Sequence, residues 1–275
     1  MDFRTLGSAL FAVALIASAE NAQANDEASI PFADGKFTIT ENADMERVLS
    51  FEGQEIARGY YLEYSRTVEI SGMDVALFEV GPGGNACGAQ TILAWKPEGE
   101  DLQTAAAGDD CGSPAPSISE TSIYFVPYLL PGTTAPVQVW TSDEGLRLAG
   151  TLSYAAQPGT TWDDLEIAEL PYLVDAFANE EVLAAATSLL GDRLADVATG
   201  LTVSDGFHEL GSGIAYGYGC VPHACGSSDA FMAIDKAGRK LYFAQQDGKG
   251  GQDAWPGLDQ WPAEVREEML KTIGG

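Results

Sequence analysis

Residues 213–244, GIAYGYGCVPHACGSSDAFMAIDKAGRKLYFA, form the stretch that decides the fold of the second half of the chain. Extended runs rich in aromatic and small apolar residues occupy 213–219, 230–234 and 241–244. The last two runs flank a short polar segment at 235–240, which is typical of a hairpin loop. The stretch therefore predicts an antiparallel sheet, with a cysteine-containing loop between its first two strands.

Helical patterns lie on both sides of this predicted sheet. Asn179 suits a helix N-cap, because Glu180 and Glu181 would then occupy the first turn. Apolar residues recur on one helical face beyond it, at Leu183, Ala186, Leu190, Leu194 and Val197. After the sheet, Pro262 opens a second amphipathic pattern. The second half is thus predicted to be a sheet flanked by helices.

The first half has a different pattern. Between Ile30 and Tyr154, short β-branched and aromatic runs alternate with turns rich in glycine and proline. The pattern changes near Gln157-Pro158-Gly159. The predicted fold class is therefore α+β, with a β-rich domain of unknown role at residues 25–158 and a C-terminal domain at residues 159–275, in which helices flank an antiparallel sheet.

The first 24 residues have the three parts of a signal peptide. A basic Arg4 precedes an apolar stretch at 6–19, and Ala22-Gln23-Ala24 is an A-x-A cleavage site. The apolar stretch is shorter than the roughly 20 residues that span a bilayer. We expect cleavage after Ala24 and a periplasmic or secreted product. A retained N-terminal anchor is the alternative.

The composition restricts the partners. The chain of 275 residues has 41 acidic and 14 basic side chains. Two acids and one base lie in residues 1–24, so the mature chain carries 39 acids and 13 bases. Such a surface repels nucleic acid and anionic lipid and favours a cationic partner. A generally acidic proteome, as in a salt-tolerant organism, would explain the charge equally well. No later segment is apolar enough for membrane insertion, and the oligomeric state stays open.

Four cysteines remain in the mature chain, and in an exported protein an even number favours disulfides. Three pairings are possible, of which Cys87–Cys111 and Cys220–Cys225 are the local choice. In the chain-entropy model the longer loop contributes about 3–4 kcal/mol and the shorter one about 2 kcal/mol. The short loop therefore matters more for local shape than for global stability.

The short loop is the most informative segment, and it reads Cys220-Val221-Pro222-His223-Ala224-Cys225. A bridge between its ends, together with the proline, would hold the histidine outward on a rigid tip, which favours binding because little entropy remains to be lost. A turn stapled only for stability is the plain alternative. A zinc site formed by the two cysteines and the histidine is a weaker one, because no fourth ligand lies nearby.

Other candidate sites are weaker still. His208, with Asp205 and Glu209, could form a triad with Ser227 or Ser228, but no nucleophile motif supports it, and a strand-edge histidine is the simpler interpretation. The acids of 247–253 do not have the spacing of a calcium loop. Walker and dinucleotide motifs are absent. We therefore predict no catalytic residue, no metal and no cofactor.

The spacing Cys220-x-Pro222-His223-x-Cys225 resembles the inhibitor of vertebrate lysozyme family, whose loop typically reads Cys-Lys-Pro-His-Asp-Cys. The resemblance covers about residues 160–275 and is sharp only over the loop. It implies a periplasmic α+β domain that is not an enzyme. It also implies that the loop enters the active-site cleft of a C-type lysozyme or another cationic muramidase, where the histidine meets two catalytic carboxylates.

Two positions depart from the family's loop. Val221 stands where the family often has lysine, and Ala224 where it often has aspartate. An alanine cannot make the hydrogen bonds of an aspartate, which bears on the affinity and identity of the target. A cell-envelope binding or structural module with the same fold and no inhibitor activity is therefore the alternative function.

Overall fold

The structure of the chain is a computed structural model that describes residues 28–84, 87–109 and 111–274. The predicted signal peptide, residues 1–24, lies outside the described residues. No helix in the described ranges combines the length and apolar character needed to span a membrane.

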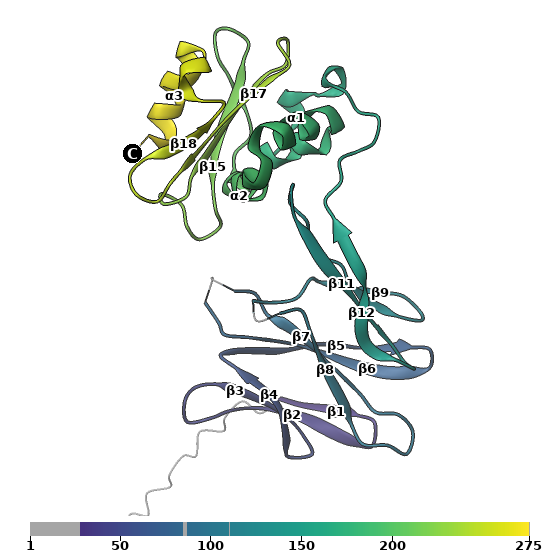
Figure 1. Cartoon of the computed structure of the whole chain (residues 1–275). Coiled ribbons are helices and arrows are strands. Elements are labelled where there is room, and N and C mark those ends of the chain that lie inside the picture. The colour runs from purple at the N-terminus through teal and green to yellow at the C-terminus, as the bar shows by residue number, and fades with distance from the viewer. Residues whose placement is uncertain (1–27, 85–86, 110, 275) are drawn as a thin grey trace, which may run out of the picture.

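The first half of the described chain consists of three antiparallel sheets, each of four strands (Figure 1). The first sheet is formed in chain order by β1 (Ala28–Phe32), β2 (Gly35–Glu41), β3 (Arg47–Phe51) and β4 (Gln54–Gly59). The second contains β5 (Tyr61–Ile70), β6 (Met73–Gly81), β7 (Gln90–Trp95) and β8 (Gln103–Ala107). The third contains β9 (Pro116–Ile118), β10 (Ile123–Phe125), β11 (Thr134–Thr141) and β12 (Gly145–Ser153).

The sheet β5–β8 lies between the other two sheets, and apolar residues on both of its faces pack against them. In β6 the consecutive residues Val75, Ala76, Leu77 and Phe78 are all buried. Side chains alternate between the faces of a strand, so Ala76 and Phe78 pack in a cluster with β1–β3, while Val75 and Leu77 pack in a cluster with β10 and β11. A continuous apolar run is the expected pattern for a strand with both faces covered.

The second half contains one six-stranded antiparallel sheet together with helices. Its sheet has the order β13-β15-β16-β17-β18, and β14 also pairs with β15. These strands are β13 (Val203–Ser204), β14 (His208–Glu209), β15 (Ala215–Cys220), β16 (Ala230–Asp235), β17 (Lys240–Gln246) and β18 (Gln252–Trp255). The α-helices are α1 (Glu180–Leu190), α2 (Leu194–Gly200) and α3 (Ala263–Ile273). Short 3-10 helices are η1 (Trp162–Asp164), η2 (Ile167–Glu169), η3 (Leu173–Ala178), η4 (Gly191–Arg193) and η5 (Leu258–Gln260).

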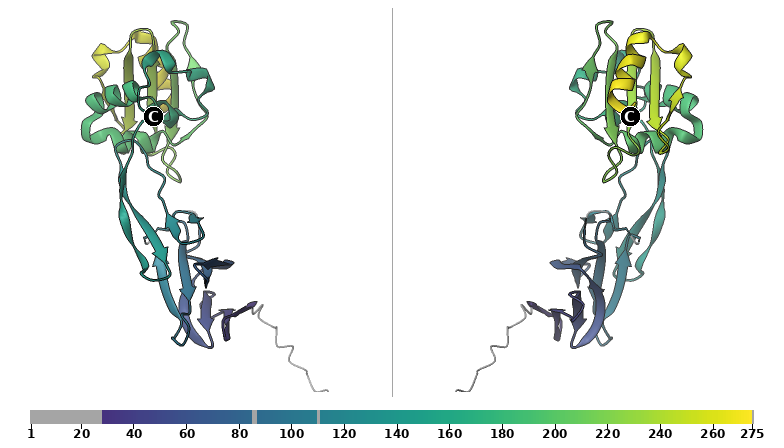
Figure 2. Two further views of the ribbon diagram at one scale, coloured as in Figure 1. Left: turned by 90° about the vertical axis from the view of Figure 1, so that its right-hand side faces the viewer. Right: turned by 90° about the vertical axis from the view of Figure 1, so that its left-hand side faces the viewer.

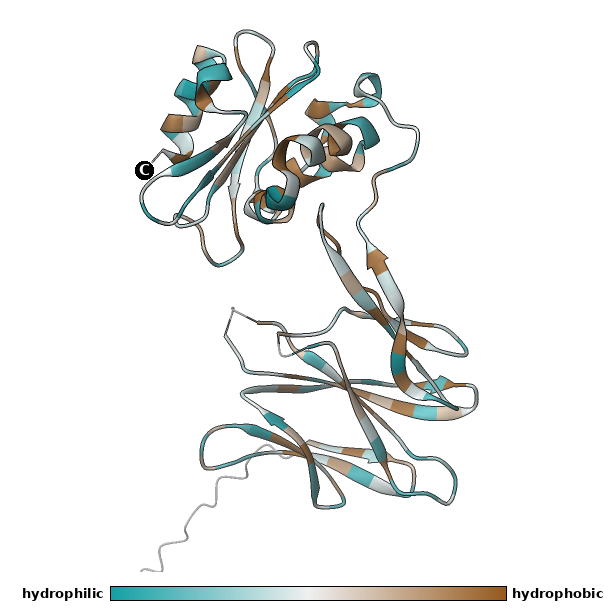
Figure 3. Ribbon diagram, in the orientation of Figure 1, coloured by the Kyte–Doolittle hydropathy of each residue, from teal (hydrophilic) through white to brown (hydrophobic). Residues whose placement is uncertain are grey.

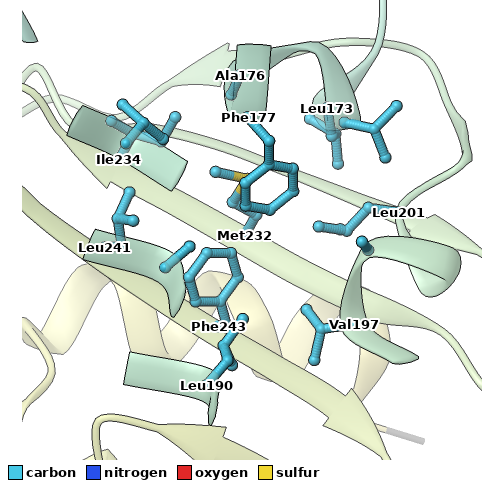
Figure 4. Packing of buried hydrophobic residues seen from close by; sticks show 14 of the residues in the cluster. Leu173, Ala176, Phe177, Leu190, Val197, Leu201, Met232, Ile234, Leu241 and Phe243 are labelled. Carbon is cyan, nitrogen blue, oxygen red and sulfur yellow. The ribbon is translucent and has the colours of Figure 1, made fainter. Parts of the chain in front are cut away.

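The hairpin β16–β17 is the centre of this half, and helices cover both of its faces. Met232 and Phe243 face η3, α1 and α2, and the ring of Phe243 stacks on Phe177 with 6.1 Å between centroids (Figure 4). On the other face, Phe231 and Tyr242 pack against α3. The protein thus has the α+β fold class that the sequence predicts, with a β-rich first half and a helix-flanked antiparallel sheet in the second.

The two halves follow one another along the long axis of the molecule (Figure 2). Side-chain and backbone contacts also join the two halves. Leu130 and Tyr154 from the first half pack against the helical core of the second. The turn at Gly132 lies so close to α2 that a Cβ atom there would be 3.0 Å from the Ala195 nitrogen. Apolar residues occur along the central strands of both halves and on the helices (Figure 3).

We predict that residues after about 159 form an independently folding domain. The Gln157 N–H donates to the Ala178 carbonyl and the Gly159 N–H to Glu180, so these residues are tied to the second half. The exposed Ala155 lies just before them and is the expected site of cleavage in limited proteolysis. The C-terminal fragment should keep a folded circular dichroism spectrum, and an unfolded fragment would contradict the boundary.

Candidate functional site: the disulfide-stapled loop

The loop between β15 and β16 begins where a glycine-rich strand leaves the sheet. A Cβ atom at Gly217 would collide with the side chain of Leu173, and one at Gly219 would lie 2.9 Å from the Val203 carbonyl oxygen. The two glycines therefore let η3 and β13 approach β15 closely. Their side of the strand is filled by neighbours, while Tyr218 and Cys220 project to the other side.

The tip of the loop is a tight turn. The Ala224 N–H donates to the Val221 carbonyl at 3.0 Å, and His223 has a φ of 63°. Proline at the second position, a positive φ at the third and this hydrogen bond form the pattern of a type II turn, which normally has glycine or asparagine at the third position. The sequence therefore places a histidine where the backbone turns most sharply, and its side chain is exposed.

The disulfide closes the base of this turn. The structure pairs Cys220 with Cys225, whose Cα atoms are 4.9 Å apart, and also pairs Cys87 with Cys111. These are the two local pairings that the sequence favours. Cys220 is buried at the end of β15, whereas Cys225 is exposed with Pro222 and His223. The bridge thus links the rigid sheet to the exposed arm of the loop.

A second turn and a glutamine hold the returning arm. The Ser227 N–H donates to the Ala224 carbonyl, and the Gly226 N–H to Oδ1 of Asp229 at 2.7 Å. Gln246, in β17, accepts a hydrogen bond from the Asp229 N–H and donates to the Ile273 carbonyl at the end of α3. The returning arm is therefore fixed to β17 and α3, and the tip is held by its own turn and by the disulfide, which makes the tip a preorganised surface.

Gln246 is a supporting residue that sequence reasoning did not identify. Nothing near it in the sequence indicates this role, since its partners are 17 and 27 residues away. The only available signal was the predicted hairpin of 230–234 with 241–244. Its observed register pairs Ala230 with Gln245 and so brings the next residue, Gln246, to the base of the loop.

The other candidate residues do not converge on a second site. His208 lies in the edge strand β14 opposite Tyr216, its ring 5.5 Å from the tyrosine ring and its Nε2 3.9 Å from Asp205. Ser227 Oγ donates to the Ala224 carbonyl. The edge-strand interpretation of His208 thus agrees with the structure.

The segment after β17 is a backbone-stabilised turn. Oδ1 of Asp247 accepts the N–H groups of Lys249 and Gly251 at 2.7 and 2.9 Å. These hydrogen bonds hold the pKa of Asp247 below its usual value. Among the described residues, no group of three or more histidine, cysteine or acidic side chains is arranged to hold a metal ion.

A glycine-to-alanine exchange in β15 tests how the strand supports the loop. In Gly217→Ala the new methyl group collides with Leu173, so we expect a loss of about 1–3 kcal/mol in the free energy of unfolding, as for other overpacked cores. Gly211→Ala is the control, because a Cβ atom there meets nothing within 4 Å. Equal stabilities of the two variants in urea denaturation would contradict the close packing of β15.

Comparison with known families gives two matches. The family model of the Y4bG N-terminal domain matches residues 33–153, in the β-rich half. The family model described as inhibitor of vertebrate lysozyme (Ivy) matches residues 181–275. No curated protein matches the chain. Residues 181–275, which contain the stapled loop, therefore match the Ivy family, and residues 33–153 match the Y4bG N-terminal domain family.

Proposed function

We propose that the protein binds and inhibits a C-type lysozyme or a related cationic muramidase by placing its stapled loop in the enzyme's active-site cleft. The observation that carries this proposal is the exposed His223 at the tip of a turn that a disulfide, a proline and backbone hydrogen bonds hold in one shape. The match of residues 181–275 to the Ivy family supports a lysozyme-inhibitor function in general.

The chemistry of a glycosidase cleft suits an imidazole. Such a cleft presents a protonated carboxylic acid beside an ionised carboxylate. A neutral imidazole can donate to one group and accept from the other, and a protonated one can pair with the carboxylate. His223 would thus occupy the position of the substrate's reacting bond and block turnover without catalysing any step itself.

The charge of the chain supports the same kind of partner. The mature sequence carries three times as many acidic as basic side chains. Long-range attraction would speed the encounter with a basic enzyme and reject other acidic proteins. Raising the salt concentration should therefore slow association and change dissociation less.

We also propose that the protein acts in the periplasm or is secreted. The two disulfides are consistent with an extracytoplasmic location, and the predicted cleavage after Ala24 would release the mature chain there. N-terminal sequencing of the exported protein tests this directly, since it should begin at Asn25.

One observation favours a second function, that of an envelope binding module without inhibitor activity. Val221 and Ala224 flank the Pro222-His223 tip and offer no side-chain hydrogen bonds to a target. A lysozyme inhibition assay on the mature protein separates the two functions, because the module would leave turnover unchanged.

His223→Ala is the sharpest test of the loop mechanism. Removing the imidazole would leave desolvated carboxylates of the cleft without partners, so we expect a loss of about 2–5 kcal/mol in binding free energy, or about 30- to 5,000-fold in Kd. Surface plasmon resonance with a C-type lysozyme measures it. His208→Ala removes the other histidine of the chain and is the control; because it leaves the loop intact, it should change binding far less than His223→Ala. Unchanged binding by His223→Ala would reduce the loop to a structural turn.

The short disulfide should matter more for binding than for stability. Replacing Cys220 and Cys225 with serine should lower the free energy of unfolding by only about 2 kcal/mol while weakening lysozyme binding, because the tip then samples many conformations. The control replaces Cys87 and Cys111 with serine. It should cost about 3–4 kcal/mol of stability and leave binding intact at temperatures where the variant is folded.

A further inference from the structure

A groove lies beside the stapled loop, on the side of β15 to which Tyr218 projects. It has a volume of about 420 Å³. Its lining residues include the bridged Cys220 and Cys225, Val203 and Tyr218, and the acidic Asp205 and Asp229. The groove therefore shares a wall with the loop that carries His223, and a partner seated on the loop would cover it.

The apolar residues of the groove are exposed to solvent. Val203 and Tyr218 are 48% and 41% exposed, although both lie in strands of the sheet. In the register of the sheet Tyr218 lies opposite Phe231, which is fully buried under α3. The tyrosine thus continues the α3-covered face beyond the helix and presents an uncovered ring.

The polar part of the groove is acidic. In the described part of the chain, Asp205 and Asp229 are its charged lining residues, and no lysine or arginine lines it. The side chain of Asp205 is 75% exposed, so it can reorient toward a ligand. Asp229 is held in place, because its Oδ1 accepts the Gly226 N–H. An uncovered aromatic ring beside two carboxylates is an environment for a cation with an apolar stem.

We propose that this groove binds an arginine side chain of the cationic protein that engages the stapled loop. A guanidinium group stacks on an aromatic face and forms paired hydrogen bonds with a carboxylate, here Tyr218 and Asp205. Its methylene stem covers apolar surface such as Val203. A lysine ammonium has no planar face to stack and no fork to match a carboxylate. This inference rests on the proposed function for its partner, but not for the chemistry of the groove.

The opposite side of the loop does not offer the same site. A second cavity there is lined by Val221 and by residues of both charges, among them Arg193 and Lys249. Three aspartates also line this cavity, and Arg193 pairs with Asp196 at 3.0 Å, so a guanidinium there would meet cations beside the carboxylates. The charged lining residues of the Asp205 groove are both acidic, so a basic side chain is attracted more strongly to that groove.

The first experiment probes the groove without a protein partner. Isotope-labelled mature protein is titrated with arginine methyl ester while backbone amide resonances are followed by NMR. We expect saturable shifts centred on Val203–Ser204 and on Tyr218, and their loss in Asp205→Asn. Citrulline methyl ester, whose ureido side chain is uncharged, should cause no such shifts. Equal responses to arginine and lysine methyl esters, or no response to arginine, would overturn the proposal.

The second experiment measures binding to a C-type lysozyme. Asp205→Asn and Tyr218→Ala should each weaken binding by about 3- to 30-fold, the range of a partly desolvated cation–π contact. Their double variant should lose less than the product of the two effects, because both contact one side chain. Tyr218→Phe keeps the ring and should bind like the parent. Asp192→Asn removes an equal charge at an exposed position away from the groove and should change Kd less than twofold.

The two proposals fail in different ways. If His223→Ala abolishes lysozyme binding while Asp205→Asn and Tyr218→Ala bind normally and melt like the parent, the groove proposal is wrong and the loop proposal stands. If the protein binds no lysozyme but the arginine ester still shifts the groove resonances in an Asp205-dependent way, the groove is supported and the proposed function is wrong.

Discussion

Burial of both faces of the β16–β17 hairpin is the constraint on which the second half of the protein depends. One face is covered by η3, α1 and α2, and the other by α3. Because residues 230–234 and 241–245 are all buried, a shift of register by one residue would exchange the two sets of side chains between different helices. The fixed register brings Gln246 to Asp229 and positions β15 along β16. The stapled loop is thus held at the end of a sheet that cannot slide.

Rigidity and exposure are combined in this loop. Its base is buried at Cys220, and its returning arm is bonded to β17 and α3 through Gln246. Its tip, Pro222-His223, is nevertheless exposed. A binding surface of this kind loses little conformational entropy when a partner docks. The acidic groove is lined by the same disulfide that closes the loop, so under the proposed function a single basic partner would contact both the groove and the histidine tip.

The first half also depends on a sheet with both faces buried, but there only strands cover it. Its middle sheet is buried on both faces by two further sheets, in place of helices. The match to the Y4bG N-terminal domain family covers 33–153, and it ends where the chain passes to the second half. Leu130, Tyr154 and the turn at Gly132 then pack on the helical core. The loop end of the C-terminal sheet is directed toward this half (Figure 1).

The sequence alone determined the fold class, the helix N-cap at Asn179, the hairpin around 235–240 and the stapled loop, because each depends on residues close together in the chain. The order of the sheets and the two-sided burial of β6 and β16 required the tertiary structure, since an apolar run does not reveal what covers each face. The positive φ of His223 likewise required the closed loop, because histidine tolerates a positive φ better than most residues but does not impose one. The groove at Asp205 and Tyr218 was decided by the tertiary structure alone, because residues from β13, β15 and the returning arm meet there only after the strands pair.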